Sequence, residues 1–150
     1  MGTEATAVVS QVTGKKGEKE HYVRVLTSCD GHPHHFGLKI HDILASKKMV
    51  NGIRLDADIH SISTSASDIA TQLLCSLKQE HPVGTIELLP ANQNFFKEYN
   101  YYFNYVLDED VCTDKLQSII VRTSTGETIF SVENHEPSRM WEEFHEFCVY

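Results

Sequence analysis

The amino-acid sequence predicts a single α+β domain over residues 1–150, with a mostly antiparallel sheet of about five to seven strands and about three helices. Segments rich in β-branched and aromatic residues come in runs rather than alternating strictly with helical segments, which favours antiparallel pairing. Other segments repeat apolar residues at helical spacing. Since no internal repeat or interdomain linker interrupts the chain, these elements are expected to share one core.

The chain opens with a predicted β-hairpin. Residues 7–12 and 21–28 are apolar and β-branched, and the charged, glycine-bearing segment 13–20 lies between them. A polar turn between two β-rich runs is the pattern of a hairpin. Residues 1–20 therefore hold the N-terminal strand and the charged hairpin loop.

A first helix is expected after the hairpin. Its apolar residues recur at helical spacing and are Phe36, Ile40, Ile43 and Leu44. Asp30 stands upstream as a capping residue, and Pro33 suits the first turn because its missing N–H costs nothing there. The Asn51–Gly52 turn signal ends the helix near Lys48.

A second helix is predicted from its capping signal. Ser65 and Asp68 have the spacing of a capping-box variant, a leucine-rich stripe follows them, and His81–Pro82 closes the run. Residues 53–62, just before it, alternate between apolar and polar and predict a short strand.

The C-terminal half combines further strands with a last helix. The predicted strands cover 85–89, 99–107, 116–123 and 127–133. The helix begins at Pro137, and its apolar stripe consists of Met140, Trp141, Phe144, Phe147 and Cys148. Because this stripe holds the only tryptophan, the helix is expected to pack on the sheet or, alternatively, against a second copy of the chain in a homodimer.

Composition excludes several classes of function. The net charge of −8 argues against general nucleic-acid binding, which needs clustered lysine and arginine. No apolar run approaches the ~20 residues of a membrane helix. The four cysteines are widely spaced, which indicates reduced thiols in a cytoplasmic protein.

The segment 29–37, CDGHPHHFG, allows three interpretations. Architecture explains it with Asp30 as cap, Gly31 at positive φ, and Gly37 letting the helix approach the sheet. Alternatively, the turn holds an anion at the helix N-terminus, for which the candidate ligand-binding residues are Asp30, Gly31, His32, His35, Arg24 and Lys39. As a metal site it offers only weak candidates, His34 and His41, which share a helical face.

Catalytic chemistry finds little support in the sequence. Cys29 has His32 and His35 as neighbours, but no nucleophile motif is present. We therefore expect no catalytic residue, no cofactor and no enzymatic activity.

For the strand 99–107, the sequence leaves open whether the aromatic side chains are exposed or lie in the core. Alternation places Tyr99, Tyr101, Phe103 and Tyr105 on one face, and Asn100, Tyr102, Asn104 and Val106 on the other. The first face either packs under a helix or, with the following acids, binds a protein partner. The candidate interaction surface consists of Tyr99, Tyr101, Tyr105, Asp108, Glu109 and Asp110.

The layout of the first third of the chain resembles a group of small uncharacterised bacteriophage proteins, in which a strand leads into an Asp-Gly-Tyr-Pro-like turn, a glycine and an apolar helix. The matching residues are Asp30, Gly31, Pro33, Gly37 and Leu38, and strand 99–105 resembles the tyrosine-rich strand of that group. His32 stands where tyrosine is usual, and residues 108–150 have no counterpart. The resemblance implies phage origin and fold rather than chemistry, and with that origin it implies that the protein acts in the cytoplasm of a host cell.

These observations leave three functions open. The first is a phage-encoded, non-enzymatic protein that binds and modulates a host or defence protein. The second is a protein that binds or sequesters a small nucleotide-type signal, with Arg24, Lys39, Arg54 and Arg122 supplying charge to phosphates. The third is a histidine-metal hydrolase.

Overall fold

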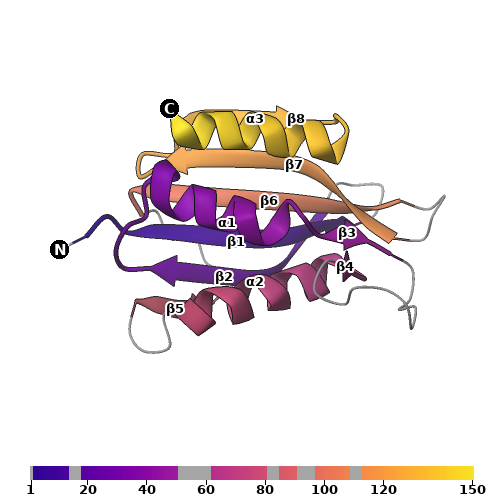
Figure 1. Ribbon diagram of the computed structural model, residues 1–150, viewed down its shortest axis with the longest axis horizontal. Coiled ribbons are helices and arrows are strands. Elements are labelled where there is room, and N and C mark those ends of the chain that lie inside the picture. Colours follow the sequence, from indigo (N-terminus) through magenta and orange to yellow (C-terminus); the bar gives the residue numbers. More distant parts are fainter. Residues whose placement is uncertain (1, 14–17, 51–61, 81–84, 91–96, 109–112) are drawn as a thin grey trace.

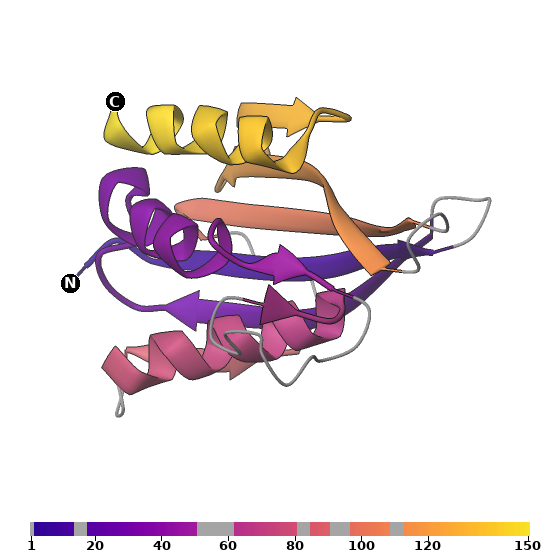
Figure 2. The same cartoon turned by 45° about the vertical axis from the view of Figure 1, so that its right-hand side comes forward.

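The computed structural model describes residues 2–13, 18–50, 62–80, 85–90, 97–108 and 113–150. These residues confirm the predicted α+β class: they form a six-stranded, mostly antiparallel sheet, a two-stranded sheet and three α-helices. All the described helices lie on one face of the larger sheet (Figures 1 and 2). None of them combines the length and apolar character of a membrane span.

The larger sheet joins the N-terminal hairpin to a C-terminal meander. From edge to edge its strands are β5 (Ile86–Leu89), β2 (Glu18–Thr27), β1 (Ala5–Thr13), β6 (Tyr99–Asp108), β7 (Thr113–Thr123) and β8 (Thr128–Glu133). Neighbouring strands are antiparallel except for β1 and β6, which are parallel. The two halves of the chain therefore meet along the central pair β1–β6 (Figure 1).

The segment after the first helix departs from the predicted boundaries. The helix α1 (Leu38–Leu44) ends earlier than residue 48, because Lys48–Met49 is extended as β3 and pairs in parallel with β4 (Ile62–Ser63). Most of the predicted strand 53–62 lies outside the described residues.

The turn that leads from β2 into α1 contains a π-helical turn, Pro33–Gly37. Asp30, and not Gly31, has the positive φ, at 57°, which corrects the prediction. Aspartate tolerates this conformation because its short polar side chain forms local hydrogen bonds. Gly31 allows a close approach instead, since a Cβ there would lie 2.6 Å from the Ala5 Cβ and 2.9 Å from the Thr3 carbonyl oxygen.

The predicted aspartate cap on this turn is also wrong. The N-cap position is His32, and no side chain caps it. Backbone contacts fix the turn in its place: the Gly31 N–H donates to the Thr3 carbonyl at 2.9 Å, and the Tyr101 hydroxyl donates to the Gly31 carbonyl at 2.8 Å. Tertiary contacts therefore hold the turn beside β6 and the segment preceding β1.

Helix α2 (Ala66–Glu80) begins at the predicted capping pair. The Ser65 hydroxyl accepts a hydrogen bond from the Asp68 backbone N–H at 3.1 Å. The Asp68 carboxylate accepts from the Thr64 backbone N–H and the Ser63 hydroxyl. Burial alone would raise the pKa of the Asp68 carboxyl, but these hydrogen bonds outweigh burial and hold the pKa below its usual value.

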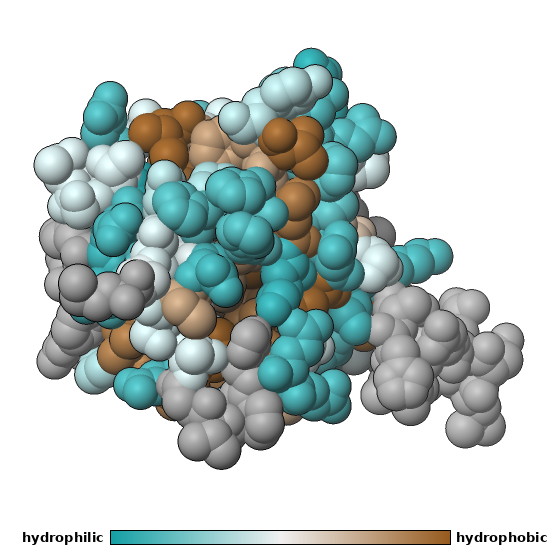
Figure 3. All heavy atoms as spheres, turned by 60° about the vertical axis from the view of Figure 1, so that its left-hand side comes forward, coloured by the Kyte–Doolittle hydropathy of each residue, from teal (hydrophilic) through white to brown (hydrophobic). Residues whose placement is uncertain are grey.

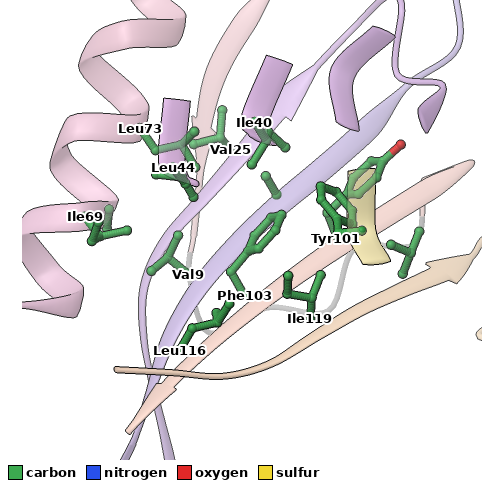
Figure 4. Close-up of a cluster of buried hydrophobic side chains, with 14 of the residues drawn as sticks. Val9, Val25, Ile40, Leu44, Ile69, Leu73, Tyr101, Phe103, Leu116 and Ile119 are labelled. Carbon is green, nitrogen blue, oxygen red and sulfur yellow. The ribbon is translucent and has the colours of Figure 1, made fainter. Parts of the chain in front are cut away.

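Helix α3 (Pro137–Val149) packs on the sheet through its predicted stripe. Its buried residues are Met140, Trp141, Phe144 and Cys148. The Trp141 ring stacks on Phe103 of β6 at 5.7 Å between centroids, and Phe144 meets the same ring edge to face. Figure 4 shows the cluster in which side chains of β1, β2, β6 and β7 meet those of α1 and α2.

Gly37 marks the closest approach between the π-helical turn and α3. A Cβ at this position would lie 2.6 Å from the Cys148 Sγ atom, so we expect Gly37→Ala to destabilise the fold by about 1–3 kcal/mol through overpacking. Cys148→Ala removes that sulfur atom, and the double variant should lose less stability than the sum of the two single variants. Urea unfolding measures all three variants. Strictly additive losses would contradict the contact.

Candidate functional site

The sheet face opposite the described helices carries its own set of side chains. Val8 of β1 is partnered with Arg24 of β2 on one side and with Tyr102 of β6 on the other. Residues partnered across strands point to the same face. We call this surface the polar face; its residues include Thr6, Val8, Ser10, Arg24, Asn100, Tyr102, Asn104, Ser118, Ile120 and Arg122.

The small polar side chains of the polar face are buried and pair with one another. The Thr6 hydroxyl donates to the Asn100 Oδ1 atom at 2.8 Å, and the Asn104 Nδ2 atom donates to the Ser118 hydroxyl at 2.8 Å. Asn100 Nδ2 also donates to the Lys97 carbonyl at 3.0 Å. These groups therefore recover the hydrogen bonds that burial takes from water.

Arg24 is the exception on this face. Its side chain is only 2% exposed, and within the described part of the chain its buried Nε and Nη1 atoms have no hydrogen-bond partner. An arginine guanidinium carries a positive charge on a planar fork that matches the oxygens of a carboxylate or phosphate. A buried charge without a counter-ion costs several kcal/mol. An anion that reached these two atoms would therefore be strongly favoured, but with Arg24 only 2% exposed it could do so only by displacing the residues that cover the side chain.

A second arginine and an aromatic ring lie on the same face. The Arg122 guanidinium carbon is 5.6 Å from the centre of the Tyr102 ring, in the range of a cation–π interaction. Arg122 is exposed and Tyr102 is half-buried. Exposed carboxylates stand nearer the edges of the sheet, where Glu87 of β5 and Glu133 of β8 occur. The face thus combines cations and an aromatic surface in an acidic protein.

The structure separates Arg24 from most of the other predicted ligand-binding residues. Asp30, His35 and Lys39 line a pocket of about 120 Å³ on the helix-bearing side, together with Thr27, Cys29, Phe36 and Ile86. The charge of Lys39 is paired there, since its Nζ atom lies 2.6 Å from the Glu80 carboxylate. Three predicted residues therefore come together, but without Arg24.

The backbone of the 29–37 turn offers little to an anion. The Gly31 N–H donates to Thr3, and the N–H groups of His35 and Phe36 both donate to the His32 carbonyl. The His32 ring is also engaged, with its Nε2 atom 2.7 Å from the Thr3 hydroxyl. These contacts favour the architectural interpretation of the turn.

The histidines fall into two separate groups. His34 lies beside His32 and His35, with ring centroids 5.4 and 4.4 Å apart, whereas His41 lies 4.9 Å from His145 of α3. In the segments that the structure describes, no three histidine, cysteine or acidic side chains are grouped so that they could hold a metal ion. The weak metal candidates His34 and His41 therefore do not converge on a described site.

The tyrosine-rich strand packs into the core. Tyr101 and Tyr105 are 0% and 3% exposed, Tyr99 is half-buried, and burial raises the pKa of the Tyr101 and Tyr105 hydroxyls. Neither buried ring offers an accessible surface to a partner in the folded chain. The acidic remainder of that predicted surface lies outside what the structure describes, namely the Asp108 side chain, Glu109 and Asp110.

The buried thiol of α3 is poorly suited to nucleophilic chemistry. Burial raises the pKa of Cys148 to about 12, which keeps the side chain in its neutral thiol form. The thiolate is the reactive species, so Cys148 serves as a small apolar residue of the core.

Sequence reasoning placed Arg24 and Arg122 among the phosphate-binding charges but assigned no role to Tyr102, Asn100 or Asn104. A signal for them does exist. Along strand 99–107 the asparagines alternate with the core aromatics, and along β1 Thr6 and Ser10 alternate with alanine and valine. This alternation indicates a second, polar face on both central strands.

No family model matches the chain, and comparison with curated proteins and with solved structures gives no match. The evidence for the candidate site is therefore its geometry alone.

Proposed function

We propose that the chain is a non-enzymatic binding protein that holds a small phosphate-bearing ligand, of nucleotide type, on the polar face. The observation that carries this proposal is the buried Arg24 guanidinium, whose Nε and Nη1 atoms lack a partner in the described part of the chain. A phosphate would supply both a counter-charge and acceptor oxygens, which removes the cost of burying the arginine.

Tyr102 and Arg122 give the polar face a second point of recognition. Aromatic and guanidinium planes stack on nucleobases, and such stacking tolerates any base because every base has a π-face. The exposed Arg122 adds charge for a second phosphate group of the ligand, since β1 and β6 separate its strand from that of Arg24. The proposed action is binding and sequestration, with no bond made or broken in the ligand.

This proposal takes the second function suggested by the sequence rather than the first. Binding to a host or defence protein was suggested by the phage resemblance, the lack of a catalytic constellation and a candidate surface of tyrosines and acidic residues. Of that surface, Tyr101 and Tyr105 are buried. The resemblance to bacteriophage proteins remains a proposal about origin. With that origin, sequestration would remove a nucleotide signal from an infected cell.

Thermal denaturation with a ligand panel tests the proposal. The panel contains inorganic phosphate, nucleoside monophosphates and diphosphates, cyclic dinucleotides and the parent nucleosides, each at about 1 mM, which detects even weak binding. We expect a phosphate-bearing member to raise the melting temperature and its parent nucleoside to leave it unchanged. A panel without any stabilising phosphate compound would overturn the proposal.

Arg122→Gln provides the variant for this test. It removes one charge from the polar face and should weaken binding of the stabilising ligand about tenfold, as measured by calorimetric titration. Arg139→Gln is the matched control, because Arg139 is exposed on α3, on the other side of the sheet. Equal losses of affinity in both variants would mean that the ligand responds only to the net charge.

A further inference from the structure

Strand β8 presents an unprotected edge of the sheet. In the described part of the chain its only neighbouring strand is β7, so one side of its backbone has no strand partner. Exposed edges are usually protected by lysine, proline or short length, because they attract other strands. The opposite edge, β5, has four residues and is followed by Pro90, whereas the six residues of β8, TIFSVE, contain neither proline nor lysine.

A groove runs between this edge and α3. It has a volume of about 540 Å³ and is lined by Phe130, Ser131, Glu143, Glu146, Phe147 and Tyr150. The rings of Phe130 and Phe147 stack at 4.9 Å between centroids, and both are only half-buried. Figure 3 shows apolar patches next to hydrophilic residues in the upper part of the molecule, where α3 and β8 lie in Figure 1.

The charges along the groove are acidic. Glu143 and Glu146 of α3 line it. Arg139 approaches Glu143 with 3.8 Å between Nε and Oε1, which is a long and exposed ion pair of little energy. An occupant with positive charge would therefore be favoured.

We propose that the β8–α3 groove binds an extended basic peptide segment of a protein partner, which adds to β8 as a further strand. In such an addition, main-chain hydrogen bonds supply affinity and alternate side chains supply specificity. Side chains that face α3 would meet Phe130 and Phe147, and lysine or arginine would reach Glu143 and Glu146. The groove lies at the β8 edge of the sheet, whereas Arg24 lies on β2 near the other edge, so the two proposals are independent.

A second copy of the chain fits this edge less well than a basic peptide. Strand β8 contains Glu133 and no cation, so a second copy would offer no positive charge to Glu143 and Glu146. Each chain also carries a net charge of −8, so repulsion adds to the local mismatch.

Fluorescence anisotropy with a designed peptide tests the proposal. The probe is a labelled peptide of about ten residues that alternates valine with lysine or arginine, and its partner probe replaces every cation with glutamate. We expect the basic probe to bind saturably at physiological salt and the acidic probe to show no binding. Amide hydrogen exchange should then slow at residues 128–133.

Charge reversal on α3 separates groove binding from general attraction. Glu146→Lys should lower the affinity for the basic probe at least about fivefold, because it replaces attraction by repulsion at the groove. Glu142→Lys changes the net charge equally at an exposed α3 residue outside the groove lining and should change affinity less than about twofold. Equal effects in both variants, exchange protection away from β8, or a wild-type dimer that Glu146→Lys dissociates would overturn the proposal.

Discussion

Replacing Phe144 with alanine should lower the free energy of unfolding by about 3–5 kcal/mol, a large share of the stability of a domain of this size. The Phe144 side chain is fully buried. Its ring contacts those of Tyr101, Phe103, Phe130 and Trp141 at 5.6–6.4 Å between centroids. Truncation would therefore leave a cavity between α3 and the sheet.

The single tryptophan reports this transition directly. Trp141 is 7% exposed and stacks on Phe103, so its fluorescence changes when α3 leaves the sheet. Phe147→Ala is the comparison variant, since Phe147 is half-buried and should lose less stability. Urea unfolding that gives Phe144→Ala the same midpoint as the wild type would mean that α3 is not part of the core.

Replacing Arg24 with methionine should have opposite effects on stability and on binding. Methionine fills a similar volume without charge, so the ligand-free variant should be more stable than the wild type by about 1–4 kcal/mol. The same change removes the proposed phosphate contact and should abolish stabilisation by any ligand of the wild type. Most large core substitutions lower stability, which makes this sign diagnostic.

Two measurements bear on the Arg24→Met prediction, namely urea unfolding without ligand and thermal denaturation with the stabilising phosphate compound. Arg139→Met makes the same chemical change at an exposed position and should alter neither quantity strongly. If Arg24→Met destabilises the ligand-free protein, the guanidinium already has a stabilising partner and has no need of an anionic ligand. If the ligand still stabilises Arg24→Met as much as the wild type, Arg24 does not contact the ligand.

The elements with local signals were predictable from the sequence. The α3 stripe has an apolar side of helical period, and the structure buries it against β6. Helix α2 begins where Ser65 and Asp68 cap it. Both signals depend on residues within a few positions of each other, so no long-range contact is needed to identify them.

The backbone conformation of the turn 29–37 could not be predicted from neighbouring residues alone. Asp30 and Gly31 are both able to adopt positive φ, and the sequence alone favours glycine. Packing decides otherwise, because the chain passes so close to Thr3 and Ala5 that only glycine fits at position 31. Contacts with distant residues therefore decide that Asp30 adopts the positive φ and that Gly31 permits the close approach.

The polar face depends on a pairing that no local pattern reveals. Thr6 and Asn100 are 94 positions apart, yet their side chains share a hydrogen bond because β1 and β6 are adjacent and parallel. The same pairing places Arg24 and Tyr102 on one face and leaves Lys39 on the other side of the sheet. Composition identified arginines as candidate ligands of a phosphate, but only the strand order shows that Arg24 and Arg122 share one face of the sheet.

Arginine-selective NMR gives the most direct test of the polar face as a binding site. Spectra of the side-chain Nε–H groups are recorded while the stabilising phosphate compound is titrated into the ¹⁵N-labelled protein. We predict that the Arg24 Nε–H signal moves strongly and the Arg139 signal stays in place, because the buried guanidinium acquires its missing acceptor. An unchanged Arg24 signal, with shifts of the backbone amide signals of His35 and Lys39 in the same labelled sample, would place the ligand in the pocket on the helix-bearing side and contradict binding at the polar face.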